Sequence, residues 1–134
     1  MRLYHGSPKK FKTLKPKKAS GMNDFENMTA IFLTKKFLYA SLYAIGKTLK
    51  GETPFGVSET KLVILGNLKP KSGYVHEVEV KNPIKGKNSQ YAYKKNLNPI
   101  KVTKVFPKNY SNHIIFVKSK KELLKELDIN LDQR

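Results

Sequence analysis

The sequence predicts an α+β fold in a single domain spanning residues 1–134. Short apolar or alternating stretches, separated by loops that contain Pro and Gly, predict several strands. One long amphipathic stretch predicts the main helix, and a capping-box pattern near the C-terminus predicts another. Mixed strands around one long helix are typical of this class. An apolar content of 39% is enough for one modest core.

Two strands and a basic loop are expected before the main helix. Residues 1–7 form a strand in which Leu3 and His5 share one face, because successive side chains of a strand alternate. Residues 8–21 form a lysine-rich loop, of a length that is usually functional or disordered inside a compact domain. Residues 30–34 form a second, apolar strand.

The main helix is expected over about residues 35–49. Thr34 is placed to cap its N-terminus, and apolar residues recur at the three-to-four spacing of one buried face. Gly51 fits the end of this helix.

The second half of the chain is expected to contain further strands and a terminal helix. The strands are residues 61–65, 74–80, 90–93, 100–106 and 113–117, with loops at 52–59 and 83–89. Ser119 and Glu122 have the spacing of a capping box. The helix that follows carries Leu123, Leu124, Leu127 and Leu131.

The charge of the chain points to an anionic partner. Lys and Arg number 27 against 10 Asp and Glu, which gives a formal net charge of +17. A field of this size attracts polyanions, so nucleic acid or another polyanion is an expected partner. Arg2 and Arg134 are the two arginines, and Lys suits phosphate contacts better than bidentate contacts to bases.

Composition also excludes several classes of site. No stretch approaches the roughly 18 apolar residues of a membrane span, and the N-terminus has no apolar leader, so no membrane partner is expected. The chain has no Cys, which excludes disulfides and thiolate metal sites and fits a cytoplasmic protein. His5, His76 and His113 lack metal-ligand spacing, so no metal is expected. The sequence leaves the oligomeric state open.

A set of motifs follows one order along the chain. In that order they are His5-Gly6-Ser7, Phe32, Tyr43 and Gln90-Tyr91. Tyr43 follows Phe32 by eleven residues. Over about residues 3–105 this set resembles the NAD-binding core of the ADP-ribosyltransferases of the diphtheria-toxin and poly(ADP-ribose) polymerase type. The strand that begins near Asn98 resembles the family's usual sequel.

The resemblance implies both a fold and a set of roles, with NAD as the substrate. The fold would be two small, mostly antiparallel sheets around one main helix, plus a C-terminal helix. His5 would hydrogen-bond a ribose hydroxyl, and the backbone of Gly6 would bond the carboxamide. Ser7 fits the variable third position of the first motif. Phe32 and Tyr43 would form aromatic walls around the nicotinamide.

Two positions depart from the family pattern. Phe32 stands where Tyr is usual, and Gln90 stands where the family has a Glu that holds a ribose hydroxyl and places negative charge near the forming cation. Gln90 can keep the hydrogen bond, but it carries no charge and cannot act as a base. Glu77 and Glu79 alternate on one strand face, where they either supply the missing carboxylate or form a solvated face.

Two functions therefore stay open, beside a third interpretation in which the chain is a small basic protein and the motif match is accidental. In the first, His5, Tyr43 and Gln90 are the catalytic residues of a protein that transfers ADP-ribose from NAD to an acceptor, with nucleic acid one candidate, or hydrolyses NAD slowly. In the second, the chain is a catalytically degenerate basic module that binds nucleic acid without NAD chemistry. A domain of this size also fits a toxin or phage protein.

Overall fold

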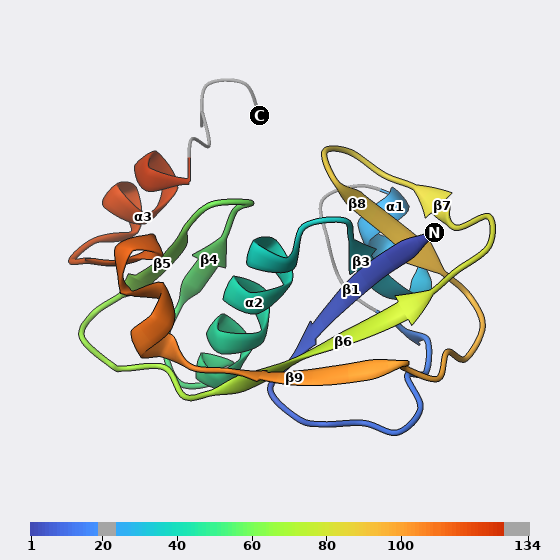
Figure 1. Cartoon of the computed structure of the whole chain (residues 1–134). Coiled ribbons are helices and arrows are strands. Elements are labelled where there is room, and N and C mark those ends of the chain that lie inside the picture. Colours follow the sequence, from blue (N-terminus) through green and yellow to red (C-terminus); the bar gives the residue numbers. More distant parts are fainter. Residues whose placement is uncertain (19–23, 128–134) are drawn as a thin grey trace.

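The computed structural model describes residues 1–18 and 24–127, and in it the main helix lies between two sheets (Figure 1). The predicted α+β class is confirmed. The strands are β1 (Arg2–Ser7), β2 (Lys17–Lys18), β3 (Thr29–Thr34), β4 (Phe55–Val57), β5 (Leu62–Leu65), β6 (Gly73–Glu79), β7 (Ile84–Lys85), β8 (Gln90–Tyr93), β9 (Lys101–Val105) and β10 (Ile114–Val117). The helices are α1 (Asp24–Asn27), α2 (Phe37–Gly46) and α3 (Lys120–Glu126), with 3₁₀ helices η1 (Lys47–Leu49) and η2 (Pro107–His113).

The larger sheet has seven antiparallel strands in the order β7-β8-β3-β1-β6-β9, with β2 paired to β3. Strand β1 is central, and it pairs with β6 along its whole length. One face of this sheet carries an apolar cluster that includes a residue of the basic loop. Its buried members are Leu3, Leu14, Ile31, Leu33, Val78, Val80 and Tyr91.

The smaller sheet has the order β10-β5-β4, with β10 parallel and β4 antiparallel to β5. Helix α3 covers it, and Leu123 packs there with Val63 and Val117. Ser119 is the N-cap of α3, as predicted, because its hydroxyl accepts a hydrogen bond from the Glu122 N–H at 3.2 Å.

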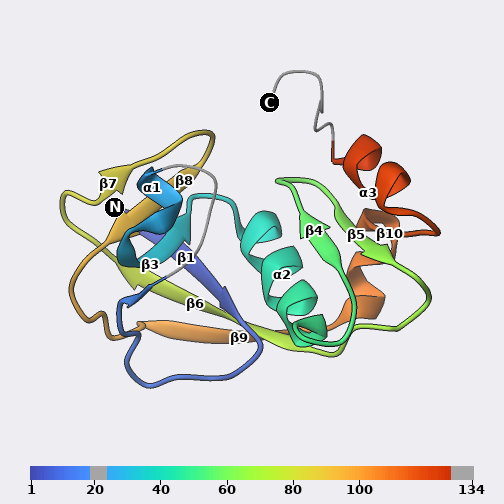
Figure 2. The same ribbon diagram turned by 180° about the vertical axis from the view of Figure 1, so that it is seen from behind.

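Helix α2 packs against both sheets, as the two opposite views show (Figures 1 and 2). Its contact with the larger sheet is made backbone to backbone. A Cβ atom on Gly6 would lie 2.1 Å from the carbonyl oxygen of Ala40, and one on Gly73 would lie 2.7 Å from that of Ala44. Two glycines on adjacent strands therefore allow α2 to rest directly on the β1–β6 pair.

The main helix differs from its prediction at both ends. It begins at Phe37 with Lys36 in the N-cap position, and the Thr34 hydroxyl accepts a hydrogen bond from the Lys36 N–H instead of capping the helix itself. Its regular part ends at Gly46 and continues as η1. Gly51 follows with a φ of +83°, a conformation that Gly adopts without strain.

Three predicted loops contain short strands. Strands β4 and β7 lie in the segments 52–59 and 83–89, and β2 lies in the segment 8–21. These strands have two or three residues each, so their formation depends on pairing with a neighbour rather than on a local pattern. Residues 19–21 of the loop and Leu131 lie outside the described residues.

Candidate functional site

The site begins where two neighbouring strands separate. Strands β1 and β3 share a single register pair, Tyr4 with Thr34. On the other side of β1, Met1 and Val80 bond to each other through main-chain N and O atoms, so the odd-numbered residues of β1 direct their peptide groups toward β6. The peptide N–H and C=O of Gly6 therefore face β3, beyond the last registered pair.

The side chain of His5 spans this gap. Its Nδ1 lies 2.8 Å from the carbonyl oxygen of Phe32 on β3. Because a carbonyl only accepts, Nδ1 carries the proton. Burial lowers the pKa of His5 from 6.5 to about 4, with a smaller contribution in the same direction from His76. The ring is therefore neutral near pH 7, and its Nε2 is an acceptor that has no hydrogen-bond partner among residues 1–18 and 24–127.

A second, fully buried imidazole supports the first. His76 lies opposite His5 on β6, with the two ring centroids 6.0 Å apart. Its Nε2 accepts the N–H of Phe11 at 3.0 Å, so its Nδ1 is the protonated nitrogen and donates to the carbonyl of His5 at 3.3 Å. His76 therefore fastens the basic loop to the strand that carries His5. The sequence showed no such role, although the pairing of β1 with β6 places the two histidines on one face.

Gly6 and Ser7 also have structural roles. The space beside the Gly6 Cα is filled by the backbone of α2, so the absence of a side chain serves helix packing. The expected approach of a ligand to the Gly6 backbone stays a prediction. The Ser7 hydroxyl is buried and accepts the N–H of Lys9 at 3.1 Å, which fixes the turn after β1.

The two expected aromatic walls lie on β3 and α2. The ring of Phe32 packs edge-on against Phe25 with centroids 5.7 Å apart. Tyr43 is 39% exposed on α2, and the ammonium of Lys47 lies 5.1 Å from the centroid of its ring. Desolvation lowers the pKa of Lys47, whose charge in turn acts to lower the pKa of His5. Lys47 thus lies in the electrostatic neighbourhood of His5.

Gln90 is held by a residue that the sequence prediction missed. Its Nε2 donates to the hydroxyl of Tyr39 at 2.7 Å. Tyr39 lies one turn before Tyr43 on α2, and the spacing of four residues was the available signal. Gln90 and Phe32 lie on the face of the sheet that α2 covers, since Gln90 is paired with Thr34 and Phe32 with Ala92.

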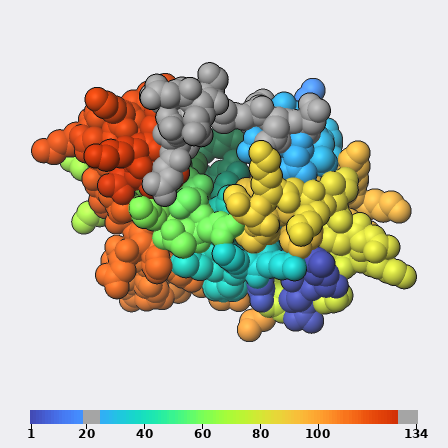
Figure 3. All heavy atoms as spheres, turned by 90° about the horizontal axis from the view of Figure 1, so that it is seen from above, coloured from blue at the N-terminus to red at the C-terminus, as the bar shows by residue number. Residues whose placement is uncertain are grey.

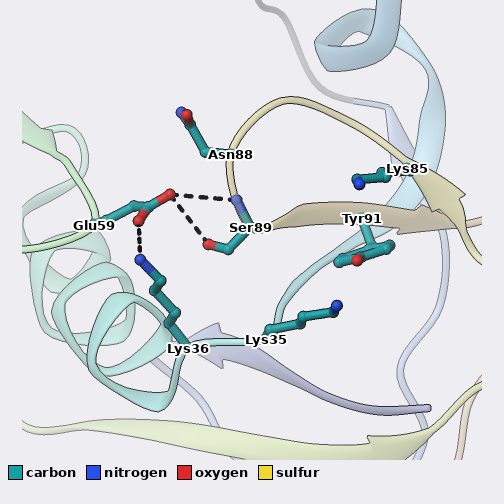
Figure 4. Close-up of a pocket in the computed structure, with 7 residues that line it drawn as sticks. All are labelled: Lys35, Lys36, Glu59, Lys85, Asn88, Ser89 and Tyr91. Carbon is teal, nitrogen blue, oxygen red and sulfur yellow. Dashed lines mark hydrogen bonds and ion pairs between the residues drawn. The ribbon is translucent and has the colours of Figure 1, made fainter.

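A carboxylate, Glu59 on the loop between β4 and β5, contacts Ser89, the residue before Gln90. It accepts hydrogen bonds from the N–H and hydroxyl of Ser89, each at 3.3 Å, and forms an ion pair with Lys36 (Figure 4). The hydrogen bond from Lys36 is the main cause that lowers the pKa of Glu59. This bridge joins the smaller sheet to the hairpin that presents Gln90.

Glu77 and Glu79 have other partners. Arg2 forms ion pairs with Glu77 at 2.7 Å and with Glu79 at 3.0 Å, and the N-terminal amine of Met1 binds Glu79 at 2.8 Å. Glu77 lies in the cross-strand row that contains Gln90, but three strands away, which is about 14 Å. The geometry therefore favours their interpretation as a solvated, ion-paired face.

Two concavities flank the hairpin of β7 and β8. One has a volume of about 330 Å³ and the other of about 540 Å³. Gln90 lines the larger one together with Phe25, whereas His5 and Tyr43 line neither. From above, the surface is hollowed between the green β4–β5 segment and the yellow β7–β8 segment (Figure 3).

Comparison of the chain with protein-family models, with curated proteins and with solved structures found no match. Within the described ranges, no helix is long and apolar enough to cross a membrane. In the same part of the chain, no three His, Asp or Glu side chains are grouped so that they could hold a metal ion.

Proposed function

We propose that this protein binds NAD at the gap between β1 and β3 and breaks its nicotinamide–ribose bond, passing ADP-ribose to an acceptor or to water. The observation that carries the proposal is the neutral imidazole of His5, which is held by Phe32 at Nδ1 and leaves Nε2 as an acceptor, on the strand where the Gly6 peptide groups face β3. His5 is the residue that the resemblance assigns to a ribose hydroxyl, and Nε2 is its free acceptor.

Gly6 supplies the complementary pair that a carboxamide requires. A primary carboxamide has one acceptor oxygen and an NH₂ donor, which match a peptide N–H and a peptide C=O. The gap places both groups of Gly6 next to His5 on the same strand. Tyr43 and Phe32 are partly exposed aromatic rings of the kind that cover a flat heterocycle.

Positive charge near His5 suits the rest of the substrate. Lys17 and Lys47 both act to lower the pKa of His5, so their ammonium groups lie in its neighbourhood. Cations there would attract the pyrophosphate of NAD.

The reaction would break the bond between the ribose C1′ and the nicotinamide nitrogen, with the bonding electron pair leaving on nicotinamide. The acceptor oxygen or nitrogen forms the new bond to C1′, and its proton passes to solvent. Positive charge develops on the ribose meanwhile, as in glycoside hydrolysis. Gln90 offers no charge to stabilise it, so the expected rate is low.

Calorimetric titration with NAD tests the proposal, using wild-type protein and His5→Asn. The Asn amide nitrogen replaces Nδ1 as donor to Phe32, but nothing replaces Nε2. We expect wild type to bind NAD in the micromolar to millimolar range and His5→Asn to lose about tenfold in affinity, the loss of about 1.4 kcal/mol that one hydrogen bond accounts for. Absence of binding at millimolar NAD, or equal binding by the two proteins, would overturn it.

A further inference from the structure

A concavity outside the His5 gap is lined by cations that the proposed NAD chemistry does not use. It lies between the start of α2 and the β7–β8 hairpin, with a volume of about 330 Å³ (Figure 4). Its charged residues are Lys35, Lys36, Lys85 and Glu59, and its other lining residues are Asn88, Ser89 and Tyr91.

The charges in this concavity do not cancel. Glu59 is committed to Lys36 and to Ser89. Lys35 and Lys85 are exposed and form no ion pair with another described residue. The ammonium of Lys35 lies 5.6 Å from the centroid of the Tyr91 ring, which holds it at the wall of the concavity. Two cations therefore face a space that Glu59 does not neutralise.

Neutral groups add to the attraction for an anion. Asn88 sits at the tip of the hairpin with a φ of 58°, and its exposed amide can donate. The hairpin is closed on itself by the Gly86 N–H, which donates to the carbonyl of Gln90 at 2.9 Å. Lys35 also lies just ahead of the N-terminus of α2, where the helix dipole contributes partial positive charge.

We infer that this concavity binds a phosphodiester of an unpaired nucleic-acid strand, which is the acceptor of the proposed transfer. The acceptor role rests on the proposed function; the binding does not. Lys85 and Asn88 line both concavities, and Gln90 lines the second one. A strand held by Lys35 and Lys85 can therefore continue into the second concavity, which Gln90 lines.

The chemistry selects a polyanion that is not base-paired. The formal net charge of +17 is far larger than a single bound phosphate needs, and it favours a chain of phosphates. A base or ribose can reach the reacting region only when it is not stacked in a duplex. Lysines recognise the backbone without reading sequence, so the inferred binding tolerates many sequences.

The test is fluorescence anisotropy with a labelled single-stranded oligonucleotide and the duplex of the same sequence. The pocket variant is Lys35→Gln/Lys85→Gln. The matched control is Lys108→Gln/Lys118→Gln, which removes the same charge at two exposed lysines that line neither concavity. We expect the pocket variant to bind the single strand about tenfold more weakly. The slope of log affinity against log salt concentration should fall by the amount that corresponds to about one to two phosphate contacts. The control should change affinity less than about threefold, the share expected of diffuse charge.

Three results would overturn the inference. Equal losses in the pocket variant and the control would mean that diffuse charge binds the strand. An equal loss on the duplex would remove the requirement for an unpaired chain. If the pocket variant binds NAD more weakly but binds the oligonucleotide as wild type does, the concavity binds a phosphate group of NAD and not one of a nucleic-acid strand. Loss of oligonucleotide binding in the pocket variant, in a protein that does not bind NAD, would support the concavity and overturn the NAD proposal alone.

Discussion

His5 Nδ1 and the carbonyl oxygen of Phe32 lie 2.8 Å apart and join two strands that no longer pair through their backbones. This bond has two consequences. It satisfies the carbonyl of Phe32 at the point where β3 leaves β1. It also fixes the tautomer of His5, so that Nε2 keeps its lone pair for another group.

The contribution of this hydrogen bond to stability can be measured separately from the role of His5 Nε2 in binding. His5→Ala removes the donor and leaves the Phe32 carbonyl without it, which should lower the free energy of unfolding by about 1 to 3 kcal/mol. His5→Asn keeps an amide donor near the same place, so it should lose less than about 1 kcal/mol. Urea denaturation of both variants measures the difference. Equal stability of the two variants would mean that the bond contributes nothing.

The neutral histidines predict a specific dependence of stability on pH. Burial lowers the folded-state pKa of His5 to about 4 and also lowers that of His76. In the unfolded chain both take up protons near pH 6.5, so the free energy of unfolding should fall as the pH drops below about 6.5. For His5 the loss should reach up to about 3 kcal/mol by pH 4.

Urea denaturation at a series of pH values checks this prediction. The informative window lies between about pH 6.5 and pH 4.5, because Glu59 and Glu79, whose pKa values are lowered, add their own loss only below 4.5. His5→Asn should flatten the slope in this window. A variant whose slope equals that of wild type would show that His5 is protonated equally in the folded and unfolded states.

The contact between Gly6 and α2 predicts a large cost for one methyl group. In Gly6→Ala the new Cβ would lie 2.1 Å from the backbone oxygen of Ala40, which cannot rotate away. We expect the free energy of unfolding to fall by about 3 kcal/mol. Gly51→Ala is the matched control, since its Cβ would meet nothing within 4 Å and only its φ of +83° costs about 1 kcal/mol. A smaller loss in Gly6→Ala than in Gly51→Ala would contradict the packing.

Strands with a strong local pattern were predictable from the sequence. Residues 1–7, 30–34 and 90–93 correspond to β1, β3 and β8, because alternation or an apolar run marks each of them. The pairs of residues in β2 and β7 were not predictable, since they become strands only when β3 and β8 lie beside them.

The sequence allowed the residues of the candidate site to be proposed, but not their contacts. The sequence placed His5 and Phe32 on two strands, but no pattern shows that the β1–β3 ladder stops after Tyr4. That stop is a tertiary property, and the orientation of the Gly6 peptide groups toward an open position on β3 depends on it. Tyr39 and Glu59 were missed because their partners, Gln90 and Ser89, come from distant segments.

The most direct test of the central claim is the release of nicotinamide from NAD by wild type, by Gln90→Glu and by Gln90→Glu/His5→Asn. Restoring the carboxylate beside Tyr39 should raise release by about 10²–10³-fold over wild type, the usual effect of one preorganised electrostatic group. Adding His5→Asn should lower this release by about tenfold, because the hydrogen bond from Nε2 is then missing. No release by Gln90→Glu, or release that the second substitution leaves unchanged, would contradict a site for NAD at the His5 gap.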